Sequence, residues 1–103
     1  MPTDVVFSAL SDPSRRSLLE ALAARESASL TELAARLPVT RQAVSKHLAV
    51  LNNAGLVESN RSGRETRYRL TPEPLSDAVV WMERIGDRWD ERLARLREHL
   101  GRR

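Results

Sequence analysis

Between residues 40 and 53, short polar side chains recur at a spacing that places them on one side of an α-helix, opposite the apolar residues. The polar side consists of Gln42, Ser45, Lys46, Ala49 and Asn53. Glutamine can form paired hydrogen bonds with adenine, lysine can bond to guanine, and serine can bond to a base or a phosphate. The small side chain of Ala49 leaves the centre of this face low, so a helix backbone could approach a DNA groove. We therefore predict that this face contacts DNA bases.

The start of the same helix and a histidine at its border have different expected roles. Thr40 is expected to cap the helix, and Thr40 and Arg41 are placed to meet a phosphate, because the first amides of a helix attract anions. His47 lies near Val44 and Leu51 in angle, at the edge of the apolar side. We favour a structural histidine with a backbone partner; a DNA contact and a metal ligand are the alternatives. Because of the second interpretation, His47 is kept among the candidate DNA contacts.

Residues 56–70 alternate in polarity as the two strands of a β-hairpin do, and Ser62-Gly63 supplies a turn between them. Arg67 and Arg69 are expected on the exposed face of the second strand. Arginines near the tip are placed to contact phosphates or the minor groove. The hairpin arginines that we predict to contact DNA are Arg61, Arg64 and Arg67. The alternative is a solvated hairpin that uses its charges to protect an edge strand.

Positive charge is concentrated in the part of the chain that holds these residues. Residues 41–69 contain six basic and two acidic residues, a net charge of +4, although the whole chain carries only +3. The rest of the chain has 11 basic and 12 acidic residues. Such a basic segment is typical of a surface that faces phosphates.

Helix caps and prolines divide the rest of the chain into further helices, which must position the two basic segments. Asp12 is expected to cap a second helix, with Pro13 at its first position, after a short first helix. Thr31 is expected to cap a third helix, and Gly55 to stop the fourth in the left-handed conformation. The predicted fold is mainly α with a small β-hairpin. It is a winged helix-turn-helix of about five helices and a two-stranded wing, in a single domain over residues 1–103.

The last predicted helix covers residues 73–100 and carries an apolar stripe. It would be about 42 Å long at a rise of roughly 1.5 Å per residue, whereas a compact domain of this length has a radius of gyration of about 13 Å. We expect a second copy of the chain to cover the stripe; coverage within the monomer is the alternative. The expected dimer interface consists of Leu75, Met82, Ile85, Trp89, Leu93 and Leu96.

Three residues of this helix lie outside that expected interface. Val80 and Trp81 are off the stripe and are expected to pack on their own domain. Gly86 leaves open whether the helix is continuous or kinked, because glycine costs about 1 kcal/mol inside a helix.

Several other protein classes do not fit the sequence. No apolar run approaches the roughly 20 residues of a membrane span, and the N-terminus lacks the pattern of a signal peptide. The absence of cysteine excludes disulfides and thiolate metal sites. We find no nucleophile–base pairing, phosphate-binding glycine loop or metal-ligand cluster. These features predict a cytoplasmic protein that is not an enzyme and holds no cofactor.

Six short motifs follow one another along nearly the whole chain. They are Leu10-Ser-Asp-Pro-Ser-Arg-Arg16, Leu30-Thr-Glu-Leu-Ala34, Val44-Ser-Lys-His-Leu-Ala-Val-Leu51, Ala54-Gly-Leu-Val57, Gly63-Arg64 and Tyr68-Arg-Leu70. In this order and spacing they resemble the ArsR/SmtB family of bacterial repressors. The resemblance implies a dimeric winged helix that represses transcription from palindromic operators, often including its own promoter.

The resemblance does not extend to the family's metal sites. Members with an arsenic- or cadmium-type site carry Cys-x-Cys near the start of the third helix, where this chain has Ser29 and Thr31. Members that sense zinc through the last helix use paired histidines with carboxylates, whereas this helix has only His99. Its segment Trp89-Asp-Glu-Arg-Leu93 is similar to a branch of the family without the thiolate site. We therefore predict no metal site.

These observations predict a sequence-specific DNA-binding transcriptional regulator, in the form of a homodimeric repressor, or autorepressor, of a palindromic operator. Its expected partners are double-stranded DNA, a second copy of itself and an effector of unknown kind. The alternative is a protein-interaction module on a winged-helix scaffold, since a fold alone does not determine function. Such modules usually lose the basic residues of the recognition helix and wing, and this chain keeps them.

Overall fold

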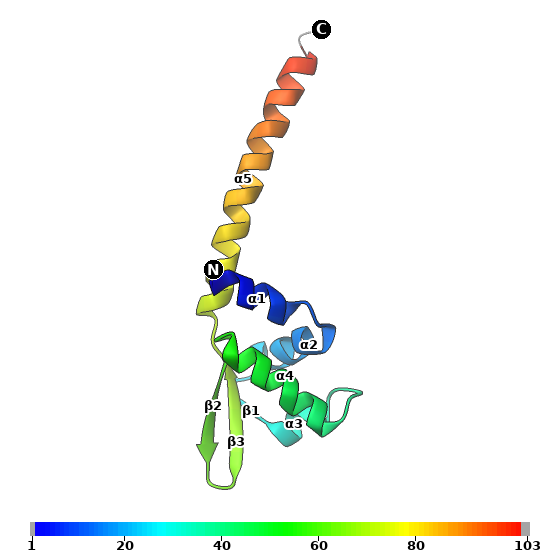
Figure 1. Ribbon diagram of the computed structural model, residues 1–103, viewed down its shortest axis with the longest axis vertical. Helices are drawn as coiled ribbons and strands as arrows, with labels where there is room; N and C mark the ends of the chain where they lie inside the picture. The colour runs from blue at the N-terminus through cyan, green and yellow to red at the C-terminus, as the bar shows by residue number, and fades with distance from the viewer. Residues whose placement is uncertain (1, 102–103) are drawn as a thin grey trace.

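The computed structural model describes residues 2–101, which form five helices and a three-stranded antiparallel sheet (Figure 1). The helices are α1 (Pro2–Leu10), α2 (Pro13–Ala23), α3 (Leu30–Ala34), α4 (Arg41–Asn53) and α5 (Glu73–Gly101). The strands are β1 (Ala28–Ser29), β2 (Val57–Ser62) and β3 (Glu65–Leu70), in the spatial order β1-β3-β2. The tip of the β2–β3 hairpin and the end of α5 lie at opposite ends of the molecule (Figure 1). The predicted fold class is confirmed.

An aspartate cap begins α2, as predicted. Asp12 accepts hydrogen bonds from the amides of Ser14 (2.7 Å) and Arg15 (3.3 Å), and Pro13 is the first residue of the helix. Desolvation raises the pKa of Asp12, but the two amide hydrogen bonds and nearby positive charge outweigh it, so this pKa lies below its usual value of 3.8. The cap therefore holds a charged carboxylate at the junction between α1 and α2.

The caps of α3 and α4 test two further predictions. Thr40 Oγ1 accepts a hydrogen bond from the amide of Ala43 (3.1 Å) and caps α4, as predicted. The prediction that Thr31 caps α3 is wrong, because Ser29 does so. Ser29 Oγ accepts from the amide of Glu32 (3.1 Å), and the Glu32 carboxylate accepts from the amide of Ser29 (3.3 Å). This reciprocal pair satisfies two amides at once and so moves the start of the helix ahead of Thr31.

One apolar core joins the first four helices to the base of the hairpin and the start of α5. Its largest fully buried apolar side chains are Leu18, Leu22, Leu33, Val44, Leu48, Leu51, Leu56 and Val57. Burial of each side chain of this size contributes about 1.5–3 kcal/mol. Because α3, α4 and the hairpin share this core, they are held in one fixed arrangement.

β1 is a strand that the polarity pattern did not predict. Its residues Ala28 and Ser29 pair with Tyr68 and Arg67 of β3. A strand this short shows no periodicity of its own. Its pairing depends on where the tertiary fold places β3, and it turns the predicted two-stranded wing into a three-stranded sheet.

The two left-handed glycines stand where the chain turns. Gly55 follows α4 with a φ of 75°, as predicted. In the hairpin, Ser62 pairs with Glu65, so the turn is Gly63-Arg64 rather than the predicted Ser62-Gly63. Gly63 has a φ of 64°, and a positive φ at the first turn residue alone is the pattern of a type II′ turn.

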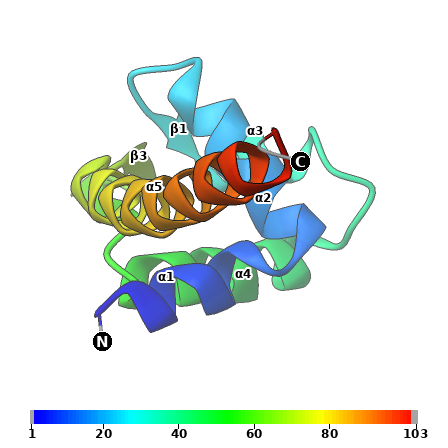
Figure 2. The same ribbon diagram turned by 90° about the horizontal axis from the view of Figure 1, so that it is seen from above.

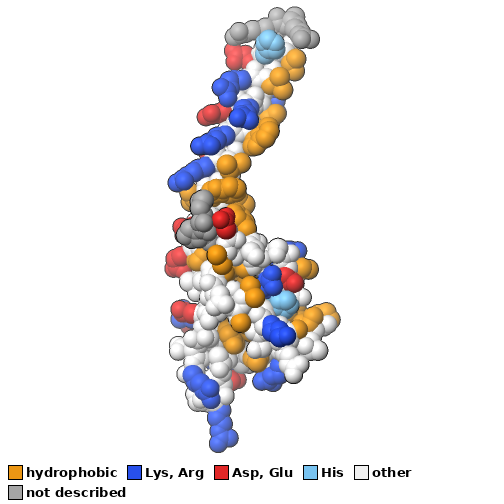
Figure 3. Space-filling model, in the orientation of Figure 1, with side chains coloured by type: hydrophobic (Ala, Val, Ile, Leu, Met, Phe, Trp, Pro, Cys, Tyr) orange, Lys and Arg blue, Asp and Glu red, His pale blue; other side chains and the backbone are white. Residues whose placement is uncertain are grey.

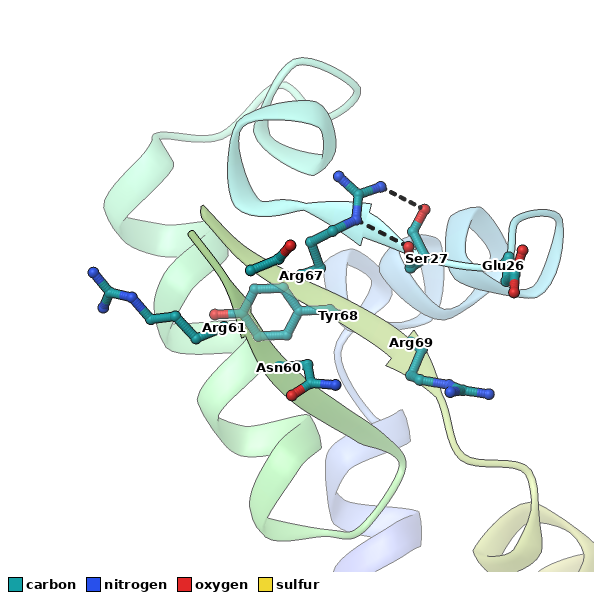
Figure 4. A pocket seen from close by; sticks show the side chains of 8 residues that line it. Glu26, Ser27, Asn60, Arg61, Arg67, Tyr68 and Arg69 are labelled. Carbon is teal, nitrogen blue, oxygen red and sulfur yellow. Dashed lines mark hydrogen bonds between the residues drawn. The ribbon is translucent and has the colours of Figure 1, made fainter. Parts of the chain in front are cut away.

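The guanidinium of Arg67 turns from β3 towards the segment that precedes α3 (Figure 4). Its Nε donates to Ser27 Oγ (3.0 Å), and its Nη1 donates to Glu32 Oε1 (3.2 Å). The expectation that Arg67 stands on the exposed face of the strand is therefore only partly right: 31% of its side chain is exposed, because β1 brings this segment alongside β3. Glu32 also accepts from Arg25. The amide of Ser29 and the Arg25 guanidinium lower the pKa of Glu32 to about 2.

α5 is continuous through Gly86 and extends far beyond the core. Apart from its chain neighbours and the nearby backbone of its own helix, a Cβ added at Gly86 would meet no atom within 4 Å, so no close packing requires a glycine there. The molecule measures 70 × 25 × 22 Å and has a radius of gyration of 18.8 Å, against about 13 Å for a compact domain of this length. None of the helices within residues 2–101 combines the length and apolar character needed to cross a membrane. Most of α5 is thus an overhang with no core of its own.

Only the beginning of α5 packs on the rest of the protomer. Ala78 is buried, and Leu75, which we had placed in the dimer interface, is half-buried against the protomer's own core. Trp81 meets Phe7 of α1 edge to face, with 5.4 Å between ring centroids, as expected for packing on its own domain. Val80, for which we expect the same packing, is 46% exposed.

We predict that Glu32→Gln lowers the thermal midpoint at neutral pH and that this deficit shrinks in acid. The folded pKa of Glu32 is about 2, below its ordinary 4.5. Its carboxylate therefore stabilises the fold fully above pH 4.5 and loses this contribution as the pH falls towards 2. Thermal denaturation of both proteins, from neutral pH to about pH 3, measures the difference. Glu26→Gln, which removes a nearby exposed carboxylate, is the control; an acid-independent deficit in Glu32→Gln would contradict the prediction.

Candidate nucleic-acid interface

The buried side of α4 decides which of its side chains face outwards. Val44, Leu48 and Leu51 are 0% exposed. The opposite side presents exposed Gln42, Ser45, Lys46, Ala49 and Asn53, the orientation that the spacing predicted. Within residues 2–101, no hydrogen bond or ion pair engages the side chains of Gln42, Ser45 and Lys46. Their donors and acceptors are therefore available to a ligand.

The N-terminal end of α4 lies at the surface. Thr40 and Arg41 are both exposed there. The Thr40 oxygen accepts the cap hydrogen bond, and its hydroxyl hydrogen can still be donated to another group. α3 precedes this end and is anchored by Leu33, which is 0% exposed. The two helices and residues 35–40 between them form the helix-turn-helix.

The wing holds Arg61 and Arg64 at its tip, where both are exposed. Arg61 Nε donates to the Gly63 carbonyl (3.4 Å), which leaves its terminal nitrogens unused by that bond. Basic side chains protrude at the hairpin end of the molecule in the space-filling view (Figure 3). Exposed arginines of this kind are suited to neutralise phosphates.

The other two wing arginines have partners within the protomer. Arg69 pairs with Glu58 directly across the hairpin at 3.3 Å, with both side chains more than half exposed. An exposed pair of this kind adds little stability, and it fits the alternative in which charge protects the hairpin. Arg67 is tied to Ser27 and Glu32. Its predicted contact with DNA is untested, and its bonds here connect the wing to α3.

His47 has a side-chain partner instead of the backbone partner that we favoured. Arg15 Nη1 lies 3.3 Å from His47 Nδ1. Because a guanidinium can only donate, Nδ1 must accept and the ring carries its proton on Nε2. His47 is half-buried at the border of the outer face of α4, and its contact with DNA remains a prediction.

The pairings of Arg15 with His47 and of Arg67 with Glu32 were missed by sequence reasoning. Their partners are 32 and 35 positions apart in the chain. Helical and strand periodicities reach only a few residues, so no spacing pattern could have pointed to either pair.

Beside the wing lies a hollow of about 290 Å³ whose lining includes Ser27, Asn60, Arg61 and Tyr68 (Figure 4). It is open and polar, and Arg67 crosses one side of it to reach Ser27. Within residues 2–101, no three His, Cys, Asp or Glu side chains are close enough together to hold a metal ion. The chemistry that this part of the molecule offers is hydrogen bonding and positive charge on α4 and the wing tip.

The chain is similar to known transcriptional regulators over most of its length. Residues 10–60 match a helix-turn-helix domain family. The uncharacterized HTH-type transcriptional regulator YuzN of Bacillus subtilis strain 168 is 41% identical over 87 residues, which cover 78% of this chain and 95% of YuzN. The transcriptional repressor SdpR of the same strain is 31% identical over 77 residues, covering 75% and 84%. A solved ArsR-like transcriptional regulator from Rhodococcus sp. RHA1 has a TM-score of 0.81 and 45% identity, covering 94% of this chain and 91% of that one.

Proposed function

The chain belongs to the ArsR family of helix-turn-helix transcriptional regulators, and from this premise we propose that it is a homodimeric repressor of a palindromic operator. As a member of this family it is a DNA-binding transcriptional regulator. The observation that carries the proposal is the exposed, unpartnered polar face of α4, which stands out from a fully buried apolar side. Arg61 and Arg64 extend the basic surface into the wing.

Separate roles follow for the two parts of this surface. Gln42, Ser45 and Lys46 contact base edges in the major groove, and Ala49 lets the helix lie close to them. Thr40 and Arg41 meet a phosphate at the helix start. The wing arginines contact the neighbouring backbone or minor groove. Arg67 is left out of the interface because its donors are used within the protomer.

The overhang of α5 supports a dimer. Its exposed apolar side chains are Met82, Ile85, Trp89, Leu93, Leu96 and Leu100, and they follow one side of the helix (Figure 3). Trp89 alone is 57% exposed, and a continuous apolar surface of this kind is rarely left in water. A twofold dimer places two α4 helices in successive major grooves, roughly 34–36 Å apart, so the operator is an inverted repeat.

Repression is the regulatory outcome that we propose. SdpR, one of the relatives, is named a transcriptional repressor. A dimer bound across a promoter blocks transcription by occupying it, and the gene of this protein is one candidate target. The role that we propose is that of a cytoplasmic DNA-binding protein and not of an enzyme. An effector that releases the DNA would complete the regulation.

Selection of duplexes from a randomised DNA library with the purified protein tests the proposal. We expect the selected sequences to share an inverted repeat. Their affinity should fall steeply with salt, with a slope of log K against log salt of about −0.9 for each phosphate neutralised. Failure to enrich any duplex, with no salt-sensitive shift in a gel, would favour the protein-interaction module instead.

Substitutions on α4 and at the wing tip should have different effects on DNA binding. Gln42→Ala and Ser45→Ala are expected to relax the preference for the selected duplex over altered sequences, at about 1–3 kcal/mol for a paired base contact. Arg64→Ala is expected to weaken all duplexes alike and to reduce the salt slope by about 0.9. Anisotropy titrations against matched and altered duplexes measure both. Intact discrimination in both α4 variants would show that the base-contacting face has been assigned to the wrong residues.

The dimer is tested on the overhang of α5. We expect Leu93→Glu to shift the protein from dimer to monomer in sedimentation, because the substitution places a charge in the apolar stripe. The folded spectrum of the core should be kept in circular dichroism, since Leu93 lies outside the core, while the melting temperature falls because the partner no longer stabilises the folded state. Glu91→Lys is the control, because a residue two positions away lies about 200° around the helix. A dimer that survives Leu93→Glu would overturn this interface.

A further inference from the structure

We infer that Arg15 is a positioning residue for DNA binding, which holds the recognition helix α4 to the C-terminal end of α1 through His47. The inference rests on the proposed function, because it concerns how the α4 surface is held for DNA. Neither Arg15 nor His47 belongs to the face of α4 that we propose to contact bases. Arg15 stands on α2, and His47 lies at the border of that face.

The guanidinium of Arg15 on α2 uses three nitrogens to bond to two other helices, α1 and α4. Arg15 Nε donates to the Ala9 carbonyl (2.6 Å), and Nη2 donates to the Ser8 carbonyl (3.3 Å). Both carbonyls belong to the last turn of α1, where a positive charge is favourable. The Ser8 carbonyl also accepts from the amide (3.2 Å) and the hydroxyl (2.6 Å) of Ser11. The third donor, Nη1, reaches His47 Nδ1 on α4 (3.3 Å). Arg15 thus bonds to both α1 and α4 from a position between them.

The base of this side chain is itself held in place. The Asp12 carboxylate accepts from the amides of Ser14 and Arg15, which ties the Arg15 backbone to the cap of α2. The His47 ring is oriented in turn, because its Nδ1 must accept from Arg15. Its Nε2–H is then the one ring donor left for another group, and the ring cannot rotate without losing the Arg15 bond.

α1 connects this bridge to the part of the molecule that we assign to the dimer. Phe7 of α1 packs on Trp81 of α5. Seen from above, α1 overlies α4 and runs beside the lower part of α5 (Figure 2), and in the side view it lies between them (Figure 1). A path of direct contacts therefore runs from α5 through α1, Arg15 and His47 to α4. In a dimer, this path adds polar contacts to the apolar core that already joins α1, α4 and the start of α5, and so couples the position of α4 to that of α5.

Arg16 provides a matched control beside Arg15. Arg16 Nη1 donates to the Leu10 carbonyl (2.6 Å), so it caps the same helix end from the next position of α2. It bonds to no group of α4 among residues 2–101. Substitution of Arg16 removes an arginine cap from α1 without touching the bridge to His47.

The test compares Arg15→Gln and Arg16→Gln on a duplex selected with the wild-type protein, at a temperature where each variant is fully folded. We expect Arg15→Gln to weaken binding about tenfold, in the range of positional coupling energies, and Arg16→Gln to leave it nearly unchanged. The salt slope of Arg15→Gln should equal that of the wild type, because the bridge neutralises no phosphate. Equal affinities of the two variants would overturn the inference. A slope reduced by about 0.9 would also overturn it, because Arg15 would then be a phosphate contact.

Variants of His47 provide the second half of the test. His47→Asn keeps an acceptor near the position of Nδ1 and is expected to bind better than His47→Ala. The double variant Arg15→Gln/His47→Ala should bind no more weakly than Arg15→Gln alone, because both substitutions break one bridge. Additive losses would overturn the inference. If Arg15→Gln does not fold, Arg15→Lys takes its place in the same comparison with Arg16→Gln, because a single ammonium cannot bond to α1 and His47 as the guanidinium does. Failure of the wild-type protein to select DNA would count against the proposed function and not against the bridge.

Discussion

Burial of one side of α4 is the constraint on which the rest of the structure depends. Val44, Leu48 and Leu51 are fully buried in a core shared with α2, α3 and the base of the wing. Turning the helix by even a quarter of a circle would expose these side chains, each worth about 1.5–3 kcal/mol. The polar face that includes Gln42 and Ser45 is therefore held outwards by the apolar face behind it, and its chemistry is presented in one orientation.

The second constraint is an apolar surface that the protomer does not cover. α5 leaves the core after its first turns, and its stripe from Met82 to Leu100 stays exposed. The short α1 touches both the start of this helix, through Phe7 and Trp81, and the arginine that reaches α4. The proposed association through α5 and the presentation of α4 are thus connected by direct contacts, although the residues that carry them are far apart.

Local sequence patterns predicted most helix ends correctly, because a helix cap depends on residues that are close to it in the chain. Asp12 and Thr40 each accept a hydrogen bond from a backbone amide at the start of their own helix, and Gly55 adopts the left-handed conformation that ends α4. The cap of α3 was misassigned because Ser29 and Thr31 are both good caps. The reciprocal hydrogen bonds between Ser29 and Glu32 are what favour Ser29 over Thr31 as the cap.

The sequence by itself determined which faces of the helices are apolar, where positive charge is concentrated, and that no thiolate can bind a metal, because the chain has no cysteine. These properties follow from residue identity and from periodicities of two to four residues. The tertiary structure decided the rest: the pairing of β1 with β3, the inward turn of Arg67, and the bridge from Arg15 to His47. Each of these interactions joins groups that come together only when the common core forms. A long arginine side chain bonds to the acceptors that the packed helices and strands place within its reach.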